Sequence, residues 1–177
     1  MSQSIDDRSL GESATKVNVA SRLTAMAADR PGQNAVAMPL GRDRQGRRQY
    51  RTVTFAELEA DTNRIASGLI AAGARPGMRL ALLVGPSIDF IALVFALLKS
   101  QVAMVLIDPG MGRKNAIRCL AEVQPDGFVA IPAGQAIRTL LRHRFPKAKL
   151  NVTVGRRWFW GGPTIEQIRQ SGKSEPF

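Results

Sequence analysis

Residues 80–107 read LALLVGPSIDFIALVFALLKSQVAMVLI, and this stretch decides the fold. It contains two short apolar runs, at 80–84 and 103–107, whose length and composition fit strands that are buried on both faces. Between them, residues 88–99 are long and apolar enough to form a buried helix, and Ser87 stands where it would cap the first turn. A strand, a helix and a second strand in this order predict a parallel β-α-β unit.

The same alternation continues toward the end of the chain. The pattern predicts a helix at 112–123, a strand at 127–131, a helix at 134–144, a strand at 150–154 and a short helix at 164–170. Apolar strands without polar alternation indicate a sheet that helices cover on both faces. We therefore predict an α/β fold with a mostly parallel sheet and flanking helices.

A β-hairpin is predicted upstream of the sheet. Two extended runs, at 35–40 and 49–55, flank a polar stretch that contains Gln45-Gly46. A first helix is expected before the hairpin, capped by Asn18 and ended by Pro31-Gly32. Residues 1–16 lack periodic apolar positions and are expected to be a loose tail, which leaves 17–177 as one partial domain.

The helix after the hairpin has a strong start signal. Thr54 and Glu57 are spaced as a capping box, in which each side chain accepts a backbone N–H of the other residue. Leu58, Ile65 and Leu69 mark one apolar face, and Gly73 supplies the left-handed residue that ends the helix.

The chain of 177 residues carries a formal net charge of +11, and its arginines are densest at 42–51 and 138–149. We interpret both segments as solvated surface or as a docking face. A cationic cluster also attracts phosphates, but binding of nucleic acid is the less favoured alternative because it rests on charge alone.

The cellular compartment is inferred from three features of the sequence: the number of cysteines, the N-terminal residues and the length of the most apolar stretch. Cys119 is the single cysteine and has no partner within the chain, so a reducing compartment is expected. Residues 1–16 contain no apolar run of the kind an export signal needs. The most apolar stretch, 88–98, is much shorter than the roughly 20 residues that cross a bilayer. A cytoplasmic protein without a membrane span is expected.

Two loops at the ends of predicted strands are candidates for ligand contact. Gly85-Pro86-Ser87 follows one strand and opens a helix, where backbone N–H groups point outward. Asp108-Pro109-Gly110 follows the next strand and precedes Arg113 and Lys114, which could hold a phosphate or a carboxylate. Ligands of open α/β folds bind at this edge of the sheet. The alternative interpretation of each loop, an ordinary capped turn, remains open.

Other chemistry is poorly supported. One histidine and one cysteine cannot form a zinc cluster, and no Cys-His or Ser-His arrangement is indicated. Gly172-Lys173-Ser174 is similar to the end of a phosphate-binding loop, but Gln167 stands where that motif needs its first glycine. We expect no catalytic residue and no metal site in this chain.

Many positions between residues 52 and 109 together resemble the opening of AMP-forming acyl-adenylate synthetases, which include acyl-CoA ligases, luciferases and nonribosomal adenylation domains. The positions are Thr54-Phe55-Ala56-Glu57-Leu58, Ile65-Ala66-Ser67-Gly68-Leu69, Pro76-Gly77-Met78-Arg79-Leu80, Gly85-Pro86-Ser87-Ile88-Asp89-Phe90 and Leu97-Leu98-Lys99. Within that superfamily, the segments 106–113 and 158–163 are most similar to fatty-acyl ligases of the olefin β-lactone synthetase kind. Gln101 departs from the pattern, because the family usually has a glycine in this turn.

The resemblance implies a ligase that joins ATP and a carboxylic acid, such as a fatty acid, into an acyl-adenylate and pyrophosphate. It implies ATP and Mg²⁺ as cofactors of the whole enzyme, with CoA as a possible acceptor. It places Gly85, Pro86, Ser87 and Phe90 near an acyl channel, and Asp108, Pro109 and Gly110 near a route for CoA or the acyl group.

The ATP-binding loop and the catalytic lysine of that family are expected downstream of this stretch. We therefore expect an N-terminal piece that is inactive alone and that works only with the remaining part, either in the same protein or as the separate chain of a split enzyme. A non-catalytic module that binds an acyl chain or a protein is the alternative.

Overall fold

The structure is a computed structural model that describes residues 18–175. The predicted loose tail, residues 1–16, lies outside the described residues. The elements in chain order are α1 (Ala20–Asp29), β1 (Asn34–Arg42), β2 (Arg48–Thr54), α2 (Phe55–Ala71), β3 (Arg79–Leu83), α3 (Ile88–Lys99), β4 (Ala103–Leu106), the 3₁₀ turn η1 (Pro109–Met111), α4 (Arg113–Val123), β5 (Gly127–Ala130), α5 (Pro132–Leu140), the 3₁₀ turn η2 (Arg142–Arg144), β6 (Leu150–Thr153) and α6 (Ile165–Ser171).

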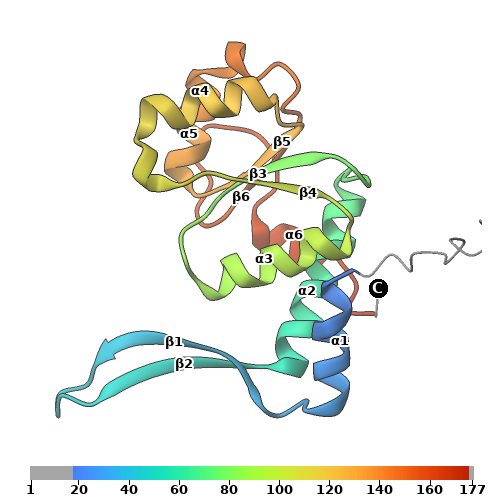
Figure 1. Cartoon of the computed structure of the whole chain (residues 1–177), viewed down its shortest axis with the longest axis vertical. Helices are drawn as coiled ribbons and strands as arrows, with labels where there is room; N and C mark the ends of the chain where they lie inside the picture. Colours follow the sequence, from blue (N-terminus) through green and yellow to red (C-terminus); the bar gives the residue numbers. More distant parts are fainter. Residues whose placement is uncertain (1–17, 176–177) are drawn as a thin grey trace, which may run out of the picture.

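A four-stranded parallel sheet in the order β4-β3-β5-β6 forms the centre of the molecule. Helices α4 and α5 cover one face, and α2, α3 and α6 lie on the other (Figure 1). The larger core contains Leu80 and Val129 of the sheet together with Leu93 of α3, all fully buried. The predicted α/β class and parallel sheet are confirmed.

The hairpin of β1 and β2 is antiparallel and extends away from the body as an arm (Figure 1). Only its base is half-buried, through residues such as Val36 and Val53, which pack against the larger core. The tip turns at Gly46, whose φ of 78° suits glycine. The arginines of the tip are exposed, as the sequence predicts.

Helix α2 is the longest in the described part of the chain and connects the arm to the body. Its capping box is formed as predicted: the Thr54 hydroxyl accepts the N–H of Glu57, and the Glu57 carboxylate accepts the N–H of Thr54. Helix α6 packs directly on α2 at Gly68, where a Cβ would lie 2.1 Å from the carbonyl oxygen of Ile168. This contact fixes the last helix against the body.

The largest difference from the predicted boundaries lies in α5. The helix expected at 134–144 begins earlier, at Pro132, and ends at Leu140, after which η2 continues as a 3₁₀ turn. The side chain of Phe145 turns inward and packs edge-on against Phe128 with 5.1 Å between ring centres. Because Pro146 follows, Phe145 is also kept out of helical geometry.

Single polar residues fix the chain at the ends of α1 and α3, although the N-cap of α1 is Val19 and not the predicted Asn18. Asn18 lies just before α1: its side-chain oxygen accepts the N–H of Ala20, and its amide donates to the carbonyl of Leu98. At the end of α3, Gln101 adopts a left-handed φ of 55°. The left-handed turn is therefore formed by a residue with a side chain, at a cost of about 1 kcal/mol.

Candidate functional site

Both predicted loops lie at the carboxyl edge of the parallel sheet. Strands β3 and β4 are neighbours, with Leu82 paired to Leu106, so the chain leaves both strands at the same edge. In the first loop the Ser87 hydroxyl accepts the N–H of Phe90 at 3.0 Å and donates to the carbonyl of Gly85 at 3.1 Å. Ser87 thus caps α3 as predicted, and the loop is well ordered by its own hydrogen bonds.

The second loop is a tight turn built by Asp108. Its carboxylate accepts the N–H of Gly110 at 2.8 Å, and its carbonyl accepts the N–H of Met111 at 3.2 Å. A Cβ on Gly110 would crowd this carboxylate at 3.1 Å. Helix α4 then starts with exposed Arg113 and Lys114, which places two cations at the same edge.

Phe90, Gly85 and Pro86 are the remaining predicted residues of the first loop, and their positions favour a structural role. Phe90 is half-buried and packs against the larger core, so its ring holds the start of α3 in place. Gly85 and Pro86 form the short connection between β3 and the cap. A role of these residues in binding stays a prediction.

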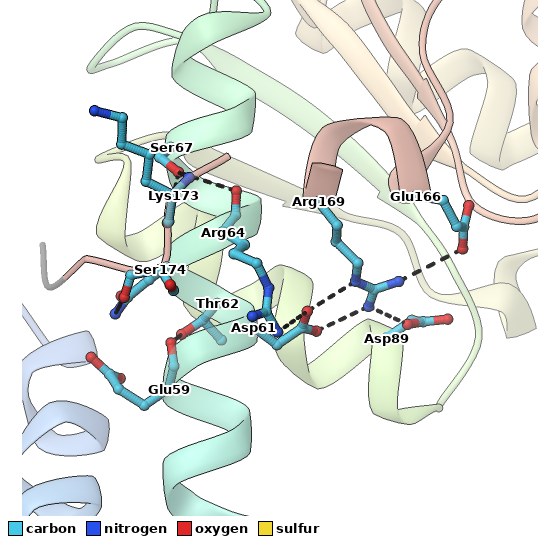
Figure 2. Close-up of polar contacts among 11 residues, drawn as sticks. Glu59, Asp61, Thr62, Arg64, Ser67, Asp89, Glu166, Arg169, Lys173 and Ser174 are labelled. Carbon is cyan, nitrogen blue, oxygen red and sulfur yellow. Dashed lines mark hydrogen bonds and ion pairs between the residues drawn. The ribbon is translucent and has the colours of Figure 1, made fainter. Parts of the chain in front are cut away.

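A charged cluster that was not predicted from the sequence lies beside Ser87. Arg169 of α6 binds both carboxylate oxygens of Asp61 on α2, each at 3.0 Å, and contacts Asp89 of α3 at 2.6 Å (Figure 2). Burial acts to lower the pKa of Arg169, but its bonds to Asp61 and Asp89 outweigh burial and raise that pKa. The guanidinium is permanently charged and already paired with carboxylates, so it positions helices and is not free to bind an anion.

This cluster lines a cavity of about 520 Å³ at the base of the arm. Its walls combine Met38 and Leu40 of β1 with Ser87 and with the Arg169 cluster. The cavity therefore combines apolar and charged lining residues. It brings one of the predicted site residues, Ser87, beside groups that come from distant parts of the chain.

A second missed feature is the buried ion pair of Lys99 and Glu59, with 2.7 Å between nitrogen and oxygen. Asn63 also accepts from the Lys99 ammonium, and Thr24 of α1 donates to Glu59. Burial lowers the pKa of Lys99, against the opposing effect of Glu59. Only 3 % of the lysine side chain is exposed, so the main effect of the pair is to join α1, α2 and α3.

The segment Gly172-Lys173-Ser174 packs along α2. The Ser67 hydroxyl accepts the N–H of Lys173 at 2.6 Å and donates to its carbonyl at 3.0 Å (Figure 2). A Cβ on Gly172 would lie 1.8 Å from the carbonyl oxygen of Arg64. In a phosphate-binding loop these backbone groups would face a ligand. Here they are in contact with helix α2.

Among residues 18–175, no group of three or more histidine, cysteine, aspartate or glutamate side chains is arranged to hold a metal ion. No helix in the described part of the chain has both the length and the apolar character to cross a membrane.

The fold is a partial α/β domain with two loops at the carboxyl edge of its parallel sheet. The family model described as AMP-binding enzyme matches residues 23–160, and the chain belongs to this family. The family resemblance in the sequence is thereby confirmed.

The curated relatives are longer than this chain. It is 40 % identical over 163 residues to the olefin beta-lactone synthetase of Xanthomonas campestris pv. campestris, covering 92 % of the chain and 29 % of the relative. It is 39 % identical over 157 residues to the olefin beta-lactone synthetase of Stenotrophomonas maltophilia, covering 88 % of the chain and 28 % of that protein. The chain therefore spans less than a third of the length of these relatives.

Solved structures share the fold at low sequence identity. The anthranilate CoA ligase AuaEII, in complex with anthranoyl-AMP, matches with a TM-score of 0.76 and 16 % identity, over 90 % of this chain and 29 % of that one. The acetoacetyl-CoA synthetase of Streptomyces lividans matches with a TM-score of 0.74 and 19 % identity, over 90 % of this chain and 26 % of that one. The partial domain predicted from the sequence is confirmed as part of the adenylating-enzyme fold.

Proposed function

We propose that residues 17–177 are the N-terminal section of an ATP-dependent, AMP-forming ligase that activates fatty acids or other carboxylic acids as acyl-adenylates. The observation that carries this proposal is the 40 % identity to an olefin beta-lactone synthetase over 92 % of the chain. Turnover requires the downstream part, which would bind ATP and Mg²⁺ and which could use CoA as acceptor. A cytoplasmic location, expected from the single cysteine, belongs to the same proposal.

Within the complete enzyme, the two loops at the carboxyl edge would form one wall of the acyl site. Gly85, Pro86 and Ser87 would shape the wall next to the acid, with Phe90 holding the cap in place. Asp108, Pro109 and Gly110 would line the adjacent route for the acceptor. Their common position at the ligand-binding edge of a parallel sheet supports these roles.

A chimera tests this proposal directly. Residues 1–177 replace the matching segment of the Xanthomonas synthetase, and fatty-acid-dependent exchange between ATP and pyrophosphate is measured. We expect exchange by the chimera, and none by the 177-residue chain alone. A third reaction supplies the downstream part as a separate chain and asks whether covalent linkage is needed.

Two outcomes would overturn the proposal. Acyl-adenylate formation by the isolated chain would show that the chemistry is contained in these residues. A chimera that folds, binds ATP and yet gives no exchange with medium- or long-chain acids would show that this section does not fit the ligase.

A non-catalytic module that binds an acyl chain or a protein is the second candidate. It is favoured by an apolar cavity between α4 and α5, lined by Ile117, Leu120, Phe128 and Ile137, whose volume of about 90 Å³ holds a short segment of an acyl chain and not a whole fatty acid. Displacement of a fluorescent fatty acid from the isolated chain measures such binding. Ala116→Phe fills the cavity and should abolish displacement, whereas Ala60→Gly on α2, far from the cavity wall, should leave it unchanged.

A further inference from the structure

The loop that joins β6 to α6 (Figure 1), residues 155–162, is called the aromatic loop below. Glycines with a φ of 98° stand at both of its ends, Gly155 and Gly162. A Cβ on Gly162 would lie 2.1 Å from the carbonyl oxygen of Asn151, and the N–H of Thr153 donates to the carbonyl of Pro163 at 3.0 Å. The base of the loop is therefore closed by close backbone contacts.

A buried tryptophan anchors the loop. Trp160 is only 4 % exposed, and its indole N–H donates to the Thr153 hydroxyl at 2.9 Å. The rings of Trp158 and Phe159 rest on it, with centroid distances of 6.1 Å and 5.0 Å. Yet Trp158 is 67 % exposed and Phe159 is 69 % exposed. Trp160 is therefore part of the buried interior, whereas the rings of Trp158 and Phe159 are exposed to solvent.

The surroundings of these rings are cationic and aliphatic. The loop sequence GRRWFWGG contains no acid, and Arg156 and Arg157 are both exposed. Arg157 donates to the carbonyl of Gly162 at 2.7 Å, which holds its guanidinium beside the loop. A Cβ on Gly155 would lie 3.8 Å from the ring of Pro132, whose neighbour Ile131 is 42 % exposed.

We propose that the aromatic loop binds the surface of an anionic lipid bilayer. Trp158 and Phe159 enter the interfacial region, where aromatic rings with an apolar body are favoured, and Arg156 and Arg157 contact lipid phosphates. The net charge of +11 attracts the whole chain to such a surface. The nearby aliphatic Ile131 favours lipid over single-stranded nucleic acid, which would need only stacking rings and cations. This inference is independent of the proposed ligase activity.

Binding is measured with the complete 177-residue chain and vesicles of phosphatidylglycerol and phosphatidylcholine, by flotation and tryptophan fluorescence. The chain has two tryptophans, and only Trp158 is exposed, so a blue shift and quenching by brominated lipid report on the loop. Trp158→Phe should retain binding and lose the shift. The pair Trp158→Ser with Phe159→Ser should weaken binding at least tenfold while circular dichroism stays that of the parent.

A matched charge control separates the loop from the basic arm. Arg156→Gln with Arg157→Gln should weaken binding about tenfold, whereas Arg44→Gln with Arg48→Gln removes the same charge from the arm and should weaken it clearly less, because the arm acts only through the net charge. The proposal is overturned by equal binding to pure phosphatidylcholine, by equal losses in both arginine pairs, or by full binding of the folded serine variant. Quenching of Trp158 by oligo-dT without vesicle binding would assign the loop to nucleic acid instead.

Discussion

Replacing Gly68 with alanine tests how α6 is docked on α2. At a solvated helical position this change stabilises a helix by about 1 kcal/mol. Here the new Cβ would lie 2.1 Å from the carbonyl oxygen of Ile168 and 2.9 Å from its Cγ2 atom, whereas ordinary contact begins near 3.4 Å. Helix α6 would have to move outward by roughly 1.3 Å, the difference between 2.1 Å and 3.4 Å.

That movement would loosen Ile165 and Ile168, which are both almost fully buried. Overpacking of this kind costs about 1–3 kcal/mol, and the loosened isoleucines add to it. We expect Gly68→Ala to lower the free energy of unfolding by about 2 kcal/mol, and Tm by about 4–8 °C for a chain of this size. The sign is opposite to that predicted by helix propensity.

Urea titration followed by circular dichroism measures this change. Ala60→Gly, in the middle of the same helix, is the matched control and should cost about 1 kcal/mol through propensity alone. A Gly68→Ala variant as stable as the parent, or more stable, would refute the close packing of α2 and α6.

Three other predictions concern the helix ends and the buried pair. Lys99→Met should lower the free energy of unfolding by about 3–5 kcal/mol because Glu59 is left buried without its cation. In a urea titration, the double variant with Glu59→Leu should regain most of this stability. A double variant that is as unstable as Lys99→Met alone would contradict the pairing. Gln101→Gly should stabilise the folded chain by about 0.5–1 kcal/mol because glycine adopts the left-handed φ without strain. Gln124→Gly should give no such gain, since the Gln124 side chain donates to two carbonyls that would lose their donor. Thermal melts of the two variants should show a raised Tm for Gln101→Gly alone. The Thr54 N–H and hydroxyl lower the pKa of Glu57 below 4.5, so its contribution is present above that pH and is lost as pH falls through the lower folded-state pKa. Glu57→Gln should flatten the fall in stability below pH 4.5, and an unchanged acid limb would count against the capping box.

Elements encoded by local patterns were predictable from the sequence. The apolar runs that became β3 and β4, and the caps Ser87 and Thr54, depend on neighbours within a few residues. The break after Leu140 was not predictable in the same way, because it depends on the contact of Phe145 with Phe128 across 17 residues. The periodicity of apolar residues cannot predict where a helix ends when a contact with a distant residue determines that end.

The loops of the candidate site were predictable, but the features that hold them in place were not. Asp89 lies in the first turn of α3, two residues after the cap, and Arg169 contacts it from 80 residues away. The same guanidinium binds Asp61 from 108 residues away, so three helices meet at one cation. A single sequence contains no signal that pairs these residues, because each reads as an ordinary surface charge. The turn at 85–87 is thus specified by local sequence and held in place by contacts from distant residues. If it binds a ligand as proposed, this rigidity would let it do so without reordering.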